Sequence, residues 1–223
     1  MAEKANTPSR TPLSRGRILR AAVALADETG IQSVSMRRLA SDLGVVAMAL
    51  YKHVENKDEL LDGMVDIVFG EIEDPSTEVD WKQAMRRRAI SARETLKRHS
   101  WAIGLMESRI NPGPANLRHH NAVMKCLREA GFSFDMAVHA YSAQDSYIYG
   151  FALQEKTLPF ESPDEHSEVI QRKAETVGDL SQYPYLIEVA ANVTQSGYDY
   201  ALEFEWGLDL ILQGLERVRG KRW

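Results

Sequence analysis

The spacing of the apolar residues is the feature that most constrains how this chain can fold. Apolar side chains recur every three or four positions along nearly the whole sequence, and no run alternates with period two for long. A period of three to four places side chains on one face of an α-helix, whereas alternation is typical of a strand. The pattern therefore predicts an all-α protein. Its 223 residues are enough for one or two domains with a buried core.

Helix start and stop signals divide the chain into segments. Ser35 and Asn56 are typical N-caps, and Gly30, Gly44 and Gly131 are typical residues at helix ends. We expect helices over residues 18–29, 35–43 and 46–53, from Asn56, from Asp80, around 101–106, before Gly131, over 134–154, over 165–195 with a break near Pro184, and around 204–215. The last of these helices carries Phe204, Leu208, Ile211 and Leu215 on one face.

Composition excludes several classes of protein. No apolar run approaches the roughly 20 residues of a membrane-spanning helix, and the N-terminus lacks the apolar core of a secretory signal. The single cysteine, Cys126, excludes an intrachain disulfide, and no spacing of Cys and His is typical of a zinc site. We expect a cytoplasmic protein that binds no membrane, metal or cofactor.

The net charge of −5 is unevenly distributed. Residues 1–60 contain nine Lys and Arg and seven Asp and Glu, a net charge of +2, so the remainder carries −7. A basic unit on an acidic protein can meet a polyanion while the rest is repelled, although many proteins share this asymmetry.

Three short helices within about 40 residues, with a glycine turn between the second and third, match the requirements of a helix-turn-helix. Ser35 would cap the second helix, Gly44 would provide the turn, and residues 46–51 would present an outer face. Helical hairpins with glycine turns are also common in proteins that do not bind DNA. The spacing alone therefore leaves both interpretations open.

The residues of this segment add a family resemblance. The run SMRRLASDLGVVAMALYKHVENKDELL resembles the DNA-binding domain of the TetR family of bacterial transcriptional repressors. The shared motifs are Leu-Ala-x-x-Leu-Gly-Val from Leu39, Leu-Tyr-x-His from Leu50 and Asn-Lys-x-x-Leu-Leu from Asn56. The resemblance covers residues 13–61 and implies an N-terminal three-helix DNA-binding domain.

The rest of the chain follows the all-helical layout of the same family. Trp81 and the runs from Ser181 to Leu186 and from Phe204 to Ile211 resemble the tetracycline repressor subgroup. The resemblance implies a C-terminal domain that binds a small-molecule effector and forms a homodimer. We expect a disordered basic arm at 1–12, a helix-turn-helix domain at 13–59, and an effector-binding and dimerisation domain at 60–223.

The helix-turn-helix offers three kinds of DNA contact. The start of the second helix can present backbone N–H groups to a phosphate and an arginine to a phosphate or a base. The third helix offers only apolar contact, which suits the methyl groups of thymine. The residues after it resemble the family's contacts to the DNA backbone. The predicted contacts are Ser35, Met36, Arg37, Val46, Ala47, Met48, Tyr51, Lys52, His53 and Lys57. The alternatives are a solvated arginine at Arg37 and, at Tyr51, a core aromatic whose hydroxyl is exposed.

The effector domain departs from the tetracycline repressor. That protein's drug and magnesium ligands fall on Glu73, Arg88, Ala92 and Met106, where its histidines, asparagine and phenylalanine are missing. A magnesium–tetracycline complex is therefore not expected, and the candidate lining suits a hydrophobic ligand. The candidate lining residues are Trp81, Met85, Trp101, Met106, His120, Met124, Asp145, Tyr147 and Phe151. The alternative is that most of these residues are core.

Two of these candidates, His120 and Asp145, interrupt apolar helix faces. A buried imidazole or carboxylate needs a partner, so these groups could orient a polar group of the effector. Alternatively, they pair with each other or with the backbone.

Dimerisation should use the long helix and the last helix of each subunit, packed as four helices, as the resemblance implies. The candidate residues are Phe204, Gly207, Leu208, Ile211 and Leu215. Part of this set could instead be core of a single chain.

Two other classes compete with a regulator. An enzyme would need Cys126 or a histidine as nucleophile or base, yet no glycine-rich phosphate loop, nucleophile elbow or paired-carboxylate motif is present. A helical protein-binding adaptor would show little salt dependence in its binding. Within the regulator class, activation is possible on the same scaffold. The resemblance favours a repressor that binds a palindromic operator as a homodimer and is released by its effector.

Overall fold

The computed structural model describes residues 12–106, 108–158, 169, 172, 181–196 and 199–221. The predicted basic arm, except Pro12, and most of the predicted helical stretch before Ser181 lie outside these residues. The all-α prediction is confirmed, because the described residues form ten α-helices, one 3-10 helix and no strand.

The N-terminal helices follow the predicted caps. They are α1 (Arg15–Thr29), η1 (Ile31–Ser33), α2 (Met36–Asp42), α3 (Ala47–Leu50) and α4 (Lys57–Glu71). The Ser35 side chain accepts a hydrogen bond from the backbone N–H of Arg38 at 3.2 Å, and that of Asn56 accepts one from Glu59 at 2.9 Å. The third helix is shorter than predicted, since it ends at Leu50 and the chain continues in turns from Tyr51 to His53.

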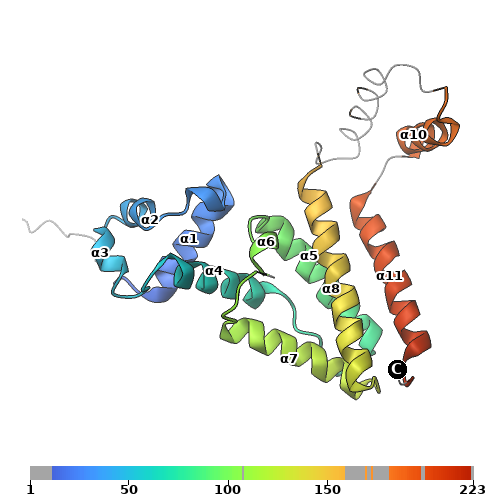
Figure 1. Ribbon diagram of the computed structural model, residues 1–223, viewed down its shortest axis with the longest axis horizontal. Helices are drawn as coiled ribbons and strands as arrows, with labels where there is room; N and C mark the ends of the chain where they lie inside the picture. Colours follow the sequence, from blue (N-terminus) through green and yellow to red (C-terminus); the bar gives the residue numbers. More distant parts are fainter. Residues whose placement is uncertain are drawn as a thin grey trace, which may run out of the picture.

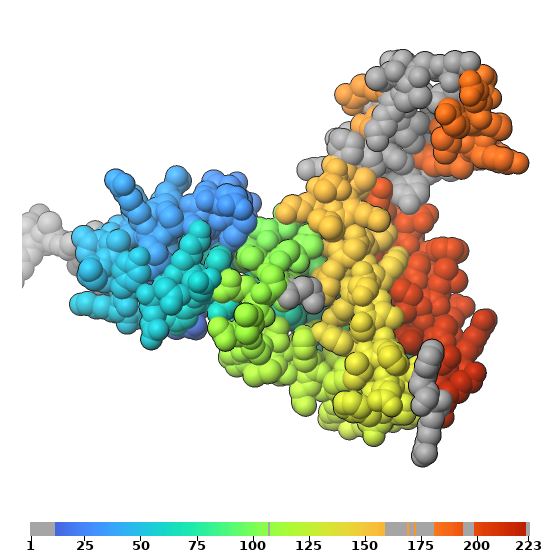
Figure 2. Space-filling view, in the orientation of Figure 1, coloured from blue at the N-terminus to red at the C-terminus, as the bar shows by residue number. Residues whose placement is uncertain are grey.

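The C-terminal helices form a bundle. They are α5 (Trp81–Arg98), α6 (Ile103–Met106), α7 (Pro114–Glu129), α8 (Phe134–Lys156), α10 (Pro184–Ser196) and α11 (Tyr200–Val218). Helix α8 packs against α5, α7 and α11, and Figure 1 shows α8 and α11 side by side. Figure 2 shows the N-terminal helices as a lobe at one end of the molecule and α10 projecting from the other.

Helix α4 joins the two parts of the molecule, because it packs against α1 and also against α7. The Asp66 carboxylate accepts hydrogen bonds from the backbone N–H groups of Ala115 and Asn116, at 2.9 and 3.0 Å. These amides belong to the first turn of α7, where N–H groups lack helical partners and favour a negative charge. A shift of α4 therefore involves α7 as well.

A second polar contact joins the parts through α1. Asp27 accepts a hydrogen bond from the Trp101 indole at 2.6 Å and lies 2.8 Å from Nδ1 of His99. The other ring nitrogen of His99 lies 3.1 Å from the Glu71 carboxylate at the end of α4.

A single apolar core runs through both parts, from Ile18 in α1 to Leu212 in α11. In the described residues, no helix is both long and apolar enough to cross a membrane.

Candidate nucleic-acid interface and polar core

Helices α2 and α3 form a compact pair around buried leucines. Leu39 and Leu50 are both fully buried, and the backbone N–H of Val45 donates to the Ala40 carbonyl at 2.9 Å across the turn. Gly44 adopts φ 65°, a left-handed conformation that suits glycine. The turn fixes α3 against α2, so its outer face is presented to solvent.

That outer face is apolar and is flanked by cations. Val46 and Met48 are 72% and 70% exposed, while Ala47 is half-buried against the core. The side chains of Lys52 and Lys57 are exposed, and His53 is half-buried. A surface of this kind can meet thymine methyl groups at its centre and phosphates at its edges.

The remaining predicted DNA contacts lie beside this face. Tyr51 is 45% exposed, so a large part of its side chain is accessible to DNA. Arg38 pairs with Asp42 at 3.3 Å, whereas Arg37 is exposed and forms no ion pair within the described part of the chain. The Met36 side chain is only 9% exposed and packs in the core, so only its backbone can serve a phosphate.

The C-terminal helices enclose a polar cluster centred on Arg88 of α5, which is 1% exposed. Its guanidinium donates to His119 Nε2 of α7 at 3.0 Å and to Gln144 Oε1 of α8 at 2.9 Å. It also donates to one oxygen of Asp145 of α8 at 2.6 Å. Asp145 therefore pairs with Arg88, and not with His120 or the backbone as the sequence had suggested.

The protonation state of His119 follows from its partners. Because a guanidinium only donates, Nε2 of His119 accepts, and Nδ1 carries the hydrogen that points to Asp74 at 2.9 Å. Burial, together with the charge of Arg88, lowers the pKa of His119 from 6.5 to about 4. Neutral His119 thus links Asp74, in the α4–α5 connection, to Arg88 and α8.

An aromatic group adjoins this cluster. His120 Nε2 lies 2.8 Å from the Tyr141 hydroxyl, and its ring lies 5.8 Å from that of Phe69 on α4. Burial lowers the pKa of His120, and burial beside Asp145 raises the pKa of Tyr141 well above its usual range. Both groups are therefore neutral near pH 7 and provide hydrogen-bonding capacity without charge.

The other predicted effector residues are dispersed over the domain. Trp81 donates to Glu216 at 3.0 Å, and Trp101 contacts α1 through Asp27. Met85 and Met106 are buried in the core, and Met124 is half-buried. The rings of Tyr147 and Phe151 pack on Phe204, with centroid distances of 5.3 and 5.1 Å. Of the predicted set, His120 and Asp145 contribute side chains to the polar cluster, and Met85 contributes its carbonyl, which accepts from Gln144 Nε2 at 3.5 Å.

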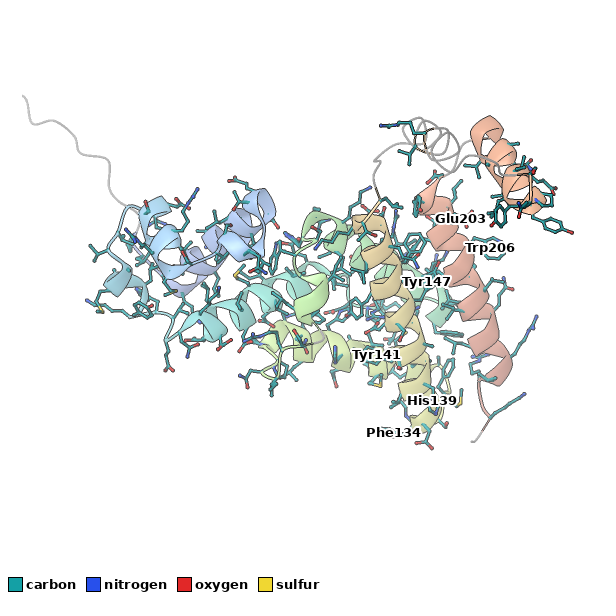
Figure 3. The ribbon with its side chains drawn as sticks, turned by 45° about the horizontal axis from the view of Figure 1, so that its top comes forward. Phe134, His139, Tyr141, Tyr147, Glu203 and Trp206 are labelled. Atoms are coloured by element: carbon teal, nitrogen blue, oxygen red, sulfur yellow. The ribbon has the colours of Figure 1, made fainter. Side chains whose placement is uncertain are left out.

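Three of the five predicted dimer residues pack within a single chain. Phe204 and Leu208 are fully buried within one chain, and the space above Gly207 is filled by Tyr147, so these three face α8 of the same chain. Ile211 and Leu215 are half-buried. The exposed large apolar side chains of α8 are Phe134, Val138 and Leu153, and those of α11 are Leu202, Trp206 and Leu210. Figure 3 marks Phe134 on α8 and Trp206 on α11.

Comparison with known proteins gives a consistent result for both parts. Residues 18–64 match the model described as "Bacterial regulatory proteins, tetR family", and residues 74–219 match "Tetracyclin repressor-like, C-terminal domain". The second match alone spans more than half of the chain. The chain belongs to the TetR family. It is therefore a helix-turn-helix transcriptional regulator.

Individual TetR relatives are similar over nearly their whole length. The repressor DrrR1 of Streptomyces coeruleorubidus is 30% identical over 96% of this chain and 83% of its own. The class C tetracycline repressor of Escherichia coli is 28% identical over 93% and 92%. The structure of Streptomyces coelicolor ActR in complex with actinorhodin has a TM-score of 0.78 at 27% identity, and the match covers 95% of this chain and all of that one.

Sequence reasoning missed the centre of the TetR effector domain, namely Arg88, His119 and Gln144. A signal was present, because Arg88 stands among the apolar residues of one face of α5, as Asp145 does on α8. Opposite charges on apolar faces of two helices can indicate a buried ion pair. Within the described residues, no group of three or more His, Cys, Asp or Glu is placed to hold a metal ion.

Proposed function

We propose that this TetR-family regulator represses transcription by binding an inverted-repeat operator as a homodimer, and that a small effector releases it. The observation that carries the proposal is the exposed face of α3, apolar at Val46 and Met48 and flanked by Tyr51, Lys52 and Lys57. The named repressors among the relatives support repression rather than activation. Occupying a promoter is enough to block it.

The proposed DNA contacts divide by role. Val46 and Met48 contact base edges through apolar surface, Arg37 reaches a base or phosphate, and Tyr51 and Lys57 contact the DNA backbone. Ser35, Met36, Ala47, Lys52 and His53 complete the proposed set, with Ser35 and Met36 contributing backbone N–H groups. Direct readout by hydrogen bonds is sparse, so shape and phosphate contacts supply much of the binding.

The proposed dimer uses the exposed apolar face of α8 and α11. Trp206, Leu202 and Leu210 are 65%, 64% and 51% exposed and recur every four residues on α11, and Phe134 on α8 is 68% exposed. A row of exposed large apolar residues is uncommon on an isolated monomer and typical of an interface. Two copies packed through this face would form a four-helix bundle.

The proposed effector response passes through α4. Phe69 of α4 contacts the rings of His119 and His120, and Asp66 caps α7, so rearrangement between α5, α7 and α8 shifts α4. In a dimer, shifted α4 helices change the separation of the two helix-turn-helix units and disfavour the DNA-bound state. ActR, which has a similar fold, was determined in complex with actinorhodin, which supports an organic effector here.

The proposal also includes the limits of the two domains, the cellular location of the protein and its lack of catalytic activity. We place the helix-turn-helix domain at 13–59 and the effector and dimer domain at 60–223, and we place the protein in the cytoplasm, where its operator would be. Cys126, the candidate nucleophile, is 3% exposed, and burial raises the pKa of its thiol, which disfavours the reactive thiolate. We therefore propose that this protein is a regulator without enzymatic activity.

Selection of bound sequences from random double-stranded DNA, at one fixed salt concentration, tests this function. We expect an inverted repeat for the wild type, binding at least about tenfold weaker for Tyr51→Ala and Lys57→Ala, and a steep fall in affinity with salt. Lys125→Ala is the matched control, because this exposed lysine lies on α7 away from α3. Recovery of no sequence by folded dimeric protein, or affinity insensitive to salt, would favour a protein-binding adaptor instead.

A further inference from the structure

One oxygen of Asp145 is incompletely satisfied. It is the single buried side-chain polar atom in the described residues that has no hydrogen-bond partner. The other oxygen of the same carboxylate accepts from Arg88 at 2.6 Å, and the residue is only 6% exposed. An unpaired buried polar atom is costly, and native proteins contain few of them. The Tyr141 hydroxyl lies close enough to the Asp145 carboxylate to raise the pKa of Tyr141, but it is engaged with His120 at 2.8 Å and leaves this oxygen without a hydrogen bond. The free oxygen therefore marks a place where a further hydrogen-bond donor would be stabilising.

The charge around this oxygen restricts the kind of donor. Arg88 and Asp145 neutralise each other, and Gln144 carries no charge. His119 and His120 are neutral near pH 7, since burial lowers the pKa of both. A further buried ion would have no counter-charge in the cluster, and an unpaired buried charge costs far more than an uncharged hydroxyl. The balance of charge thus favours an uncharged donor.

The groups beside Asp145 are largely aromatic. Tyr141 lies one turn earlier on α8, its ring is 5.1 Å from that of His120, and the Arg88 guanidinium lies 5.7 Å from its centroid. Phe69 extends this group to α4 through its contact with His120 at 5.8 Å. A molecule that reaches the free oxygen would therefore place its remaining surface against rings rather than against charges.

We propose that the effector is an uncharged, mainly apolar molecule whose hydroxyl donates a hydrogen bond to the free oxygen of Asp145. The inference rests on the proposed function, since it describes the ligand of the same regulator. A molecule bound there lies beside the rings that contact Phe69, so its arrival acts on α4. Arg88 is a positioning residue, because it holds the other oxygen of the carboxylate, and Gln144 in turn holds the Arg88 guanidinium.

Calorimetric titration of the full-length protein with four matched probes tests the proposal. The probes are 2-naphthol, an uncharged donor; 2-methoxynaphthalene, which cannot donate; 2-naphthoate, an anion; and protonated 2-(aminomethyl)naphthalene, a cation. We expect 2-naphthol to bind at least about tenfold tighter than the other three, as a hydrogen bond to a buried carboxylate implies. Equal binding of all four probes, or no binding by any of them, would overturn the proposal.

Two variants make the test specific to Asp145. In Asp145→Asn, the amide oxygen of the new side chain can keep the contact with Arg88, and the amide NH2 group then takes the place of the free oxygen. Because NH2 donates where the oxygen accepted, the variant should bind the acceptor 2-methoxynaphthalene more tightly than 2-naphthol. Glu155→Gln is the matched control. Glu155 also lies on α8 and pairs with a buried arginine, Arg93, but both of its oxygens are engaged, at 2.6 and 2.9 Å. The control should keep the wild-type preference, and a preference that survives in Asp145→Asn would contradict the assignment.

The remaining outcomes separate this inference from the proposed function. If Asp145→Asn does not fold, a crystal structure of the wild type with 2-naphthol decides. A naphthol oxygen within hydrogen-bond distance of Asp145 supports the proposal, and a buried water kept at that position overturns it. Operator binding is measured separately without probe. Operator binding without a hydroxyl preference refutes the inference alone, whereas a hydroxyl preference in a protein that binds no DNA refutes the proposed function alone.

Discussion

At the scale of single residues, the C-terminal domain depends on one buried cation. Arg88 is 1% exposed, and it contacts three residues of α7 and α8 with its guanidinium. A buried ion pair of this kind adds little net stability over apolar packing, but the loss of one partner leaves a charge buried and unpaired. The residue therefore specifies how α5, α7 and α8 fit together.

Replacing this arginine tests that role. Arg88→Met should lower the free energy of unfolding by about 3–5 kcal/mol, because Asp145 is left as an isolated buried carboxylate. Urea denaturation measures the change, with Arg87→Met as control, since Arg87 is the exposed neighbour on the same helix. Adding Asp145→Leu to Arg88→Met should restore part of the loss. A cost below about 1 kcal/mol for Arg88→Met would contradict a buried, unpaired charge.

His119 gives stability a dependence on pH. Its pKa in the folded protein is about 4, against 6.5 for an ordinary histidine. Below pH 6.5 the unfolded chain binds a proton that the folded protein does not, so stability present above pH 6.5 is lost as the pH falls towards 4. From pH 7 to 5 the loss from this group is about 2 kcal/mol. His119→Asn should show a correspondingly smaller fall in urea denaturation, and parallel pH profiles would refute the assignment.

At the scale of helices, the contact between α8 and α11 depends on one glycine. The Tyr147 ring stacks on Phe204 at 5.3 Å, and its hydroxyl donates to the Phe204 carbonyl at 3.0 Å. A side chain at Gly207 would meet this tyrosine directly. Gly207 therefore permits the close approach of the two helices within one chain, rather than between subunits as the sequence suggested.

Adding one methyl group tests this contact. Gly207→Ala should destabilise the protein by about 1–3 kcal/mol, because the new methyl group overlaps Tyr147 and forces the helices apart. Gly214→Ala is the control on the same helix, since nothing lies within 4 Å of the added carbon. The control should be stabilised by about 0.5–1 kcal/mol through helix propensity. Thermal unfolding of both variants measures the difference, and equal shifts would rule out the close contact.

At the scale of the whole molecule, the proposed function requires a second copy of the chain. One chain presents a single helix-turn-helix at one end of the molecule (Figure 1), and it exposes large apolar side chains on α8 and α11. Pairing through that face would place two helix-turn-helix units in one symmetric particle, which matches the symmetry of an inverted-repeat operator. The proposed dimer interface would thereby determine the spacing at which DNA is read.

Placing a charge on this face should separate the subunits. Leu210→Glu should yield monomers at micromolar concentration in sedimentation velocity, because a buried carboxylate would lack a partner at the interface. The same variant should lose operator affinity while its helical content remains. Leu117→Glu is the matched control, since Leu117 is a leucine of similar exposure, 57% against 51%, on α7. Dimers that persist in Leu210→Glu would place the interface elsewhere.

The sequence by itself determined the elements and the family. Ser35, Asn56 and Gly44 act locally, through a side chain on a nearby amide or a left-handed φ, so their roles could be predicted without the fold. The motifs of the helix-turn-helix lie within a short segment, and they carried the resemblance that the comparisons confirmed.

Only the tertiary structure decided which face of each helix meets which partner. Asp145 and His120 were recognisable as misplaced polar groups, but their partners, Arg88 and Tyr141, lie 57 and 21 positions away in the sequence. Phe204 and Leu208 share periodicity with a dimer face, yet they are buried against α8 of the same chain. Periodicity shows that a helix has an apolar side, and it contains no information about whether that side packs within the chain or against another copy.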